Sequence, residues 1–179
     1  MRRLLGPVGS VATLIGGGGA GGWPGQDCGF VAIPVRTIGF GFPGELRDRL
    51  NAAILSGEKT ATSSLLVEYT LDEEPLPRPG ERLVVLDSQQ RPVAVIEIVA
   101  VHVTPLGEVG LDIALAEGEG FRSVAEWRRA HEEFWNSYRD WLRGRLGDPS
   151  WQLTDDTAVV VEQFRLVETP MRPQSDGQG

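Results

Sequence analysis

The run of residues 92–104 restricts the fold more than any other feature of this sequence. Valine recurs at alternate positions along it, and β-branched side chains in alternation are typical of a strand. The positions between the valines are also apolar, so we expect both faces of this strand to be covered. The pattern consists of Val93, Val95, Val99, Val101 and Val103, with Ala94, Ile96, Ile98 and Ala100 between them.

Two further strands accompany this run. Residues 82–87 and 157–167 carry apolar side chains over lengths typical of strands. The turn at residues 88–91 joins the first of them to the 92–104 strand as a hairpin. Hairpin-linked strands with covered faces suit a small closed β-barrel with helices packed outside it.

Two helices interrupt the predicted strands. Over residues 43–57 apolar side chains recur at helical spacing, and Gly57 stands where a glycine typically ends a helix. A strand over residues 64–70 is predicted to follow. Ser123 and Glu126 have the spacing of a capping box, which predicts a second helix from Ser123 to about Gly144. These elements predict an α+β fold.

Both ends of the chain are predicted to lie outside the folded domain. Residues 1–36 are rich in glycine and have little to bury, which predicts a flexible segment. The apolar residues near the start are interrupted by Gly6, Pro7 and Gly9, and this stretch is too short to span a membrane. Residues 169–179 are predicted to be a disordered tail. We therefore expect a cytoplasmic protein whose working domain covers residues 37–168.

Charge and composition exclude several classes of function. The 179 residues carry a net charge of -8, which argues against a protein that coats DNA through phosphate neutralisation. The single cysteine, Cys28, excludes an intramolecular disulfide. The two histidines, His102 and His131, have no zinc-ligand spacing with it. We predict neither a metal nor another cofactor.

Lys59 is the only lysine among the 17 basic residues, so the other sixteen are arginines. It lies on a short turn directly after the first predicted helix. Arginine stays protonated in proteins, whereas a buried lysine amine can lose its proton, so lysine alone can serve as a base or nucleophile. The alternative is that Lys59 is an ordinary loop residue.

A second group of polar residues precedes the second predicted helix. Glu117-Gly118-Glu119-Gly120 places two carboxylates just ahead of a helix N-terminus, where the helix dipole stabilises negative charge. The glycines on either side of Glu119 permit a close backbone approach. The alternative is an acidic loop that only caps the helix.

The second predicted helix carries an aromatic stripe and many arginines. Such a stripe is typical of a helix that docks onto a core. The alternative is that the polar tips of Trp127, His131 and Tyr138 reach a cleft. Arginines from Arg139 onward alternate with acids, which is typical of a solvated helix face. Arg122 and Arg128 lie closer to the glutamates and are better candidates for ligand contacts. The stripe consists of Trp127, His131, Phe134, Trp135, Tyr138 and Trp141.

These motifs, taken in order over about residues 40–168, resemble the ASCH domain family of the PUA-like superfamily. The resemblance implies a small PUA-like β-barrel with flanking helices, and a role connected with RNA or modified nucleosides. The matching motifs are Gly57-x-Lys59-Thr60-Ala61-Thr62-x-Ser64, Pro79-Gly80-Glu81, Glu117-Gly118-Glu119-Gly120 and Trp127-Arg128-x-x-His131-x-x-Phe134-Trp135.

In a small bacterial branch of that family, the corresponding lysine, threonine and glutamate hydrolyse the amide of N4-acetylcytidine. The resemblance therefore implies catalytic roles for Lys59, Thr62 and Glu119. This chain departs from that branch at Ser64, where the small enzymes have arginine, and in its Trp127 to Trp135 signature, which they lack. Longer relatives are associated with cleavage of single-stranded RNA. The residues expected to bind substrate are Ser64, Glu117, Arg122, Trp127, Arg128 and His131.

Three functions follow as hypotheses. The first is an amidohydrolase of N4-acetylcytidine or a related acylated nucleoside, in which neutral Lys59 takes the proton of the Thr62 hydroxyl. A carboxylate at Glu119 favours the charged ammonium instead, so this role requires that the pair share a proton. The second hypothesis is a ribonuclease of single-stranded RNA. If Lys59 stays charged, it is better suited to this role, in which it holds a phosphate or an oxyanion. The third hypothesis is a noncatalytic RNA-binding module.

Overall fold

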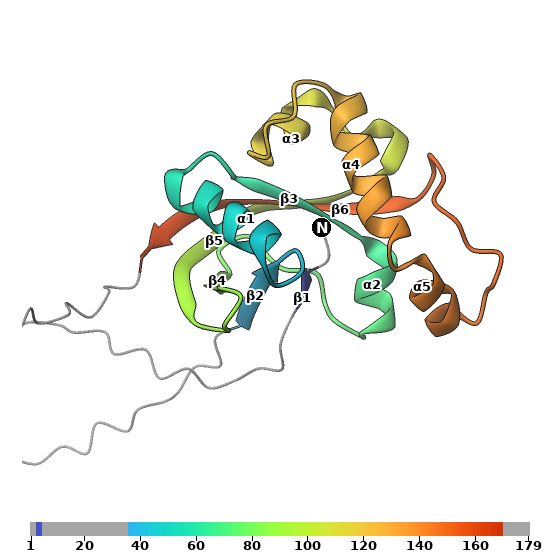
Figure 1. Cartoon of the computed structure of the whole chain (residues 1–179), viewed down its shortest axis with the longest axis horizontal. Helices are drawn as coiled ribbons and strands as arrows, with labels where there is room; N and C mark the ends of the chain where they lie inside the picture. Colours follow the sequence, from blue (N-terminus) through green and yellow to red (C-terminus); the bar gives the residue numbers. More distant parts are fainter. Residues whose placement is uncertain (1–2, 5–35, 170–179) are drawn as a thin grey trace, which may run out of the picture.

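Five strands curl into a half-barrel in the computed structural model of this chain, which describes residues 3–4 and 36–169 (Figure 1). They lie in the order β2, β4, β5, β6, β3, and β1 pairs with the outer edge of β2. Among the strand pairs of the described residues, only β2 and β4 are parallel. The elements are β1 Arg3–Leu4, β2 Arg36–Phe40, α1 Glu45–Ser56, β3 Ala61–Leu65, α2 Leu66–Leu71, β4 Arg82–Leu86, β5 Pro92–Pro105, α3 Leu111–Ala116, α4 Val124–Asn136, α5 Arg139–Leu146 and β6 Ala158–Glu168, with a 3-10 turn at Leu106–Glu108.

This architecture confirms the predicted α+β fold, a small PUA-like barrel with flanking helices. The barrel is half-open rather than closed, because β1 and β3 are the two ends of the strand order. The predicted flexible segment 1–36 and the predicted tail 169–179 lie almost entirely outside the described residues. Within the described ranges, no helix is long and apolar enough to cross a membrane.

Helices cover the sheet from both sides. On one side, Leu50 and Ile54 of α1 pack against β2, β4, β5 and Phe164 of β6. On the other side, α3, α4 and α5 pack against Leu65 of β3 and Val161 of β6. Figure 1 shows α1 below the β3 and β6 ribbons, α3 above them, and α4 descending from above across their level toward α5. Strands β3 and β6 therefore run between two separate cores.

The predicted strand at 64–70 is wrong in position. The strand is β3, and it ends at Leu65, where α2 begins. The Glu68 carboxylate accepts a hydrogen bond from the Leu65 backbone N–H at 3.3 Å, which satisfies an amide that a helix start would otherwise leave without a partner. This local bond favours a helical turn over continuation of the strand.

The second predicted helix begins as expected but is two helices. The Ser123 hydroxyl accepts from the Glu126 backbone N–H at 3.2 Å, which confirms the predicted start. Helix α4 ends at Asn136 and α5 begins at Arg139. Between them the Ser137 hydroxyl donates to the Phe134 carbonyl at 2.6 Å, a local bond that competes with helix continuation.

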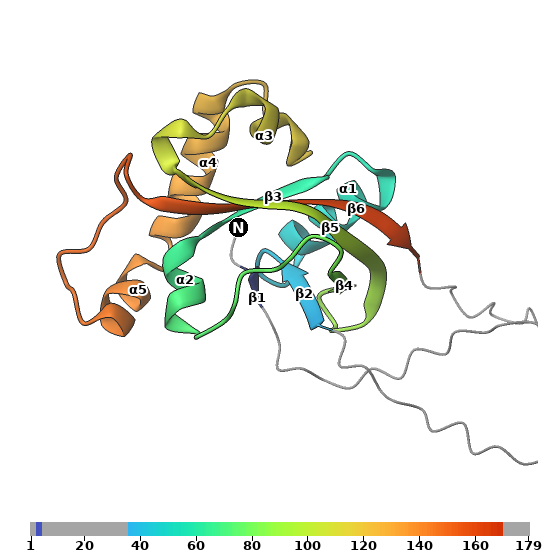
Figure 2. The ribbon, with the colours of Figure 1, turned by 180° about the vertical axis from the view of Figure 1, so that it is seen from behind.

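The prediction that β5 is covered on both faces is also wrong. Val99 and Val103 are each 47% exposed. Strand β4 pairs only with the first part of β5, from Pro92 to Glu97, whereas β6 pairs with β5 as far as Pro105. Beyond Glu97, β5 has a neighbour on only one side among the described strands, and seen from behind it curves along β6 (Figure 2).

Candidate active site

The turn between α1 and β3 holds Lys59 in place through its backbone. Gly57 ends α1 with a left-handed conformation, φ 81°. The Lys59 N–H then donates to the Ala53 carbonyl at 2.9 Å, and the Thr60 N–H donates to the Ala116 carbonyl at 2.7 Å. These bonds tie the lysine turn both to the helix before it and to the end of α3.

Gly118 brings the glutamate loop, residues 117–120, against this turn. It has φ 63°, and a Cβ atom at this position would lie 2.5 Å from the backbone of Glu58 and from the Lys59 nitrogen. Only glycine permits both the backbone conformation and the close approach. Because Gly118 lies between Glu117 and Glu119, its contact sets both carboxylates beside the lysine side chain.

The Lys59 ammonium has an acceptor for each of its three protons. Its Nζ lies 3.1 Å from the Glu117 carbonyl oxygen, 3.3 Å from Glu117 Oε2 and 3.1 Å from Glu119 Oε1. The side chains of Lys59 and Glu117 are fully buried, and that of Glu119 is 3% exposed. A buried amine surrounded by acceptors alone is satisfied as the ammonium ion. Lys59 is therefore a fixed cation in this structure.

Glu117 is held from the opposite side by α4. Its Oε1 accepts from Trp127 Nε1 at 2.8 Å, and its Oε2 lies 3.4 Å from His131 Nε2. Burial by itself favours the neutral acid, but the charges of His131 and Lys59 outweigh it and hold the pKa of the Glu117 carboxyl well below its usual value. Glu117 is therefore an ionised carboxylate at the centre of the cluster.

His131 packs against Glu117 from α4. Its Nδ1 lies 2.9 Å from the Trp127 carbonyl oxygen, and its Nε2 lies 3.4 Å from Glu117 Oε2. The ring stacks on Trp127 with centroids 4.3 Å apart and planes 25° apart. The imidazole is therefore held between the Trp127 indole and the Glu117 carboxylate.

Thr62 and Ser64 lie on β3 with buried side chains, 2% and 1% exposed. Within the described ranges, neither hydroxyl has a hydrogen-bond partner. Thr62 Oγ1 is thus bonded neither to Lys59 nor to Glu119. The Lys59 ammonium lies 5.9 Å from the centre of the Phe40 ring, and Phe40 lies 5.7 Å from Phe164.

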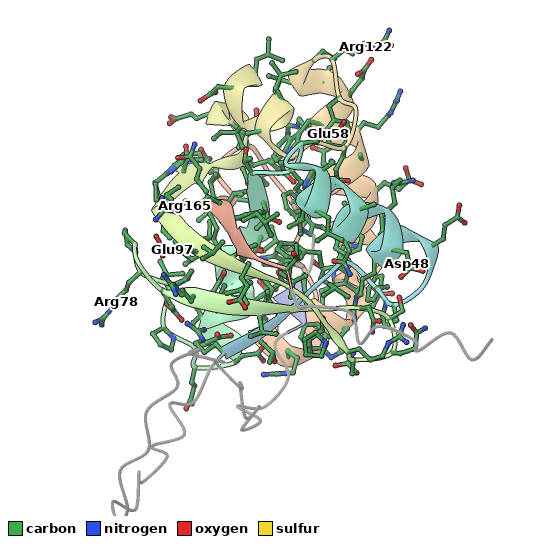
Figure 3. The ribbon with its side chains drawn as sticks, turned by 90° about the vertical axis from the view of Figure 1, so that its left-hand side faces the viewer. Asp48, Glu58, Arg78, Glu97, Arg122 and Arg165 are labelled. Carbon is green, nitrogen blue, oxygen red and sulfur yellow. The ribbon has the colours of Figure 1, made fainter. Side chains whose placement is uncertain are left out.

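The structure separates the residues predicted to bind substrate into two groups. Glu117, Trp127 and His131 converge with Lys59, buried between α3 and α4. Arg128 and Arg122 lie outside this buried cluster. Arg128 is paired with Glu132 at 2.7 Å and Asp155 at 2.5 Å, and Arg122 is exposed and points away from the protein at the end of the molecule that also carries Glu58 (Figure 3).

Two polar residues near this site were missed by sequence reasoning. Glu162 is fully buried on β6, and Tyr69 of α2 donates a hydrogen bond from its hydroxyl to Glu162 Oε1. A single acid after the apolar run Val159-Val160-Val161 is the signal that marks Glu162 in the sequence. Tyr69 has no such signal, because its contact depends on the helical form of α2.

The site has no donor set for a metal. In the ranges that the structure covers, no group of three or more histidine, cysteine, aspartate or glutamate side chains is arranged to hold a metal ion. The carboxylates of Glu117 and Glu119 are already occupied by Lys59.

Comparison with known proteins identifies the family. The family model of the ASCH domain matches residues 36–168. A solved structure of an Enterococcus faecalis protein, family model DUF984, is 30% identical with a TM-score of 0.63, covering 73% of this chain and 75% of the other. An ASCH domain from Lactobacillus crispatus is 31% identical with a TM-score of 0.61, covering 72% and 76%. No curated protein matches the sequence. The chain belongs to the ASCH domain family.

Proposed function

We propose that this protein is a hydrolase that cleaves the amide of N4-acetylcytidine or of a related acylated nucleoside. The observation that carries the proposal is the convergence of the Lys59 ammonium with Glu119 at 3.1 Å, in a buried cluster three residues before Thr62. The buried Thr62 hydroxyl has no hydrogen-bond partner among the residues described. Buried polar groups are normally paired, so a hydroxyl without a partner is a candidate for contact with a ligand.

The charges of the cluster favour a division of roles between its two carboxylates. Glu117 is bonded by Trp127 and faces both Lys59 and His131, so its negative charge is fully compensated. Glu119 makes one contact with Lys59. We assign the proton donor for the departing amine to Glu119, because a carboxyl held only on one side can both give and take a proton.

Lys59 takes the second of the two roles that the sequence left open, that of a fixed cation rather than a neutral base. Since three acceptors surround its amine, it acts as a cation. A fixed positive charge in a buried site stabilises the oxyanion that forms when the Thr62 hydroxyl attacks the acyl carbon. The acyl group is then carried by Thr62 and released by water.

Release of acetate from N4-acetylcytidine by the purified full chain tests this function. We expect Lys59→Ala to lower the rate by about 100- to 1000-fold, because removal of one oxyanion-stabilising group typically costs this much. Glu119→Gln should also be impaired, whereas Glu58→Gln, the same change at an exposed neighbour, should retain full activity. No acetate release by the wild type, or equal release by Lys59→Ala, would refute the proposal.

Cleavage of single-stranded RNA is the second candidate. The exposed Arg122 and Arg129 at the start of α4 favour it, because they are placed to meet a phosphate backbone. Against it, the Lys59 ammonium is already paired with two carboxylates, and these repel a phosphate. Intact single-stranded RNA after prolonged incubation would dispose of this function. RNA binding without cleavage should instead give an affinity that falls steeply with salt.

A further inference from the structure

A row of buried polar side chains crosses from β3 to β6. In the antiparallel pairing of these strands, Thr62 stands directly opposite Glu162 and Ser64 opposite Val160. Directly opposed residues point to the same face, with Cβ atoms about 5 Å apart. Thr62 is 2% exposed and Glu162 is fully buried. The hydroxyl of Thr62 and the carboxylate of Glu162 are therefore close neighbours on one face of the sheet.

Helix α2 supplies a hydrogen-bond donor to the Glu162 carboxylate. The Tyr69 hydroxyl donates to Glu162 Oε1, and the Tyr69 side chain is itself buried, 5% exposed. Since α2 follows β3 without a connecting loop, the segment of residues 61–71 supplies both Thr62 and the group that orients Glu162. On the β5 side, Glu162 is paired in register with the apolar Val101.

The same face leads to Lys59. Phe164 lies two residues beyond Glu162 on β6, and successive alternate residues of a strand share a face. The Phe164 ring lies 5.7 Å from Phe40, and the Phe40 ring lies 5.9 Å from Lys59 Nζ. The rings of Phe164 and Phe40 therefore connect this face of the sheet to the lysine ammonium.

Thr62 needs a base that Lys59 does not supply. A threonine hydroxyl is a weak nucleophile until a neighbouring group takes its proton. All three protons of the Lys59 amine face acceptors, so it offers no lone pair. The carboxylate directly opposite Thr62 in the sheet is the remaining candidate within the described part of the chain.

We propose that Glu162 is the general base for Thr62 and that Tyr69 is its positioning residue. This inference rests on the proposed role of Thr62 as the nucleophile. The Thr62 oxygen forms a bond to the acyl carbon while its proton passes to Glu162. The carbon–nitrogen bond breaks, the nitrogen keeps the electron pair, and Glu119, in its protonated form, gives its proton to that nitrogen. Water then attacks the Thr62 ester and gives a proton to Glu119, while Glu162 returns its proton to the Thr62 oxygen as the acid is released.

The two groups are not hydrogen-bonded to each other in this structure. Rotation about χ1 of Thr62 moves its hydroxyl between staggered positions. Catalytic hydrogen bonds are often longer in a protein without substrate and tighten in the complex. The pairing of β3 with β6 thus places the base directly opposite the nucleophile in the sheet.

Acylation of Thr62 by p-nitrophenyl acetate tests this role without the natural substrate. The purified full chain is mixed with this ester, nitrophenolate release is followed by absorbance, and the acetyl group is located by mass spectrometry of the Thr62 peptide. We expect the wild type to be acetylated on Thr62. Glu162→Gln should lower that rate by at least about 100-fold, which is the usual loss on removal of a general base. Glu168→Gln, the same change at an exposed position of β6, is the matched control.

Tyr69→Phe separates catalysis from folding. It keeps the buried ring, removes only the hydroxyl, and should lower the acylation rate by about 10-fold if Tyr69 orients Glu162. This variant also decides the question if Glu162→Gln fails to fold. A wild type that is not acetylated on Thr62, or undiminished acylation in a folded Glu162→Gln or in Tyr69→Phe, overturns the inference. Acylation of Thr62 that depends on Glu162, without hydrolysis of N4-acetylcytidine, supports the inference and refutes the proposed substrate.

Discussion

Replacing Gly118 with alanine probes the contact that joins the glutamate loop to the lysine turn. An alanine here must adopt φ near 63°, which costs about 1–2 kcal/mol for a residue with a Cβ atom. That atom would also lie 2.5 Å from the backbone of Glu58 and Lys59, so the two loops must move apart. Forced repacking of this kind costs about 1–3 kcal/mol. We expect Gly118→Ala to lower the free energy of unfolding by about 2–5 kcal/mol.

Gly120 provides the matched control for this change. It also has a left-handed backbone, φ 85°, but no heavy atom lies within 4 Å of the position of its missing Cβ. Gly120→Ala should therefore lower the stability by only the conformational cost of about 1–2 kcal/mol. The difference between the two variants isolates the steric contact at residue 118.

Urea unfolding followed by tryptophan fluorescence measures both variants, because the midpoint shifts with the free energy of unfolding when the slope is unchanged. In the folded fraction of Gly118→Ala, acetate release from N4-acetylcytidine should also fall, since the loop that carries Glu119 is displaced from Lys59. Equal destabilisation by Gly118→Ala and Gly120→Ala would refute the reasoning. It would mean that the close approach contributes nothing to stability.

A substitution and a change of pH test the charge cluster, and a substitution at Arg128 tests a pair of ion pairs outside it. Glu117→Gln should lower the free energy of unfolding by about 3–5 kcal/mol in urea titrations, because it leaves buried cations without their partner. The folded-state pKa of Glu117 lies well below its ordinary value of 4.5, so its contribution to stability is present above that value and is lost as the pH falls below it. The wild type should therefore lose more stability than Glu117→Gln between neutral pH and acid, as unfolding midpoints at several pH values will show. Arg128→Ala should change stability by less than about 1 kcal/mol in the same assay and leave catalysis intact, because its ion pairs are partly exposed.

Local signals in the sequence predicted where helices begin and end. They did not predict which parts of an element are covered by other elements of the fold. Gly57 and Ser123 mark helix boundaries through bonds made within a few residues, and both boundaries are found in the structure. The exposure of Val99 and Val103 depends on where β4 stops pairing with β5, which no pattern within β5 records. Strand β2 and helix α3 are short, and neither was predicted.

The residues of the candidate site also fall into those predicted from local motifs and those that depend on contacts between distant parts of the chain. The motifs around Lys59 and Glu119 are local, and the structure brings these two residues within 3.1 Å. The charged state of Lys59 was left open by the sequence because it depends on Glu117, which is 58 residues away along the chain. Glu162 and Tyr69 were missed because their contact joins a strand and a helix 93 residues apart, and its register is set by the pairing of β3 with β6.

The geometry explains why this chain keeps a single lysine at position 59. Three acceptors converge on one nitrogen atom, from the Glu117 carbonyl, the Glu117 carboxylate and the Glu119 carboxylate. A compact ammonium with three rotatable donors fits such a point, whereas the planar guanidinium of arginine spreads its donors over a wider fork. The fully buried side chain leaves no space into which that fork can extend. The one lysine therefore stands where the shape of the cation matters.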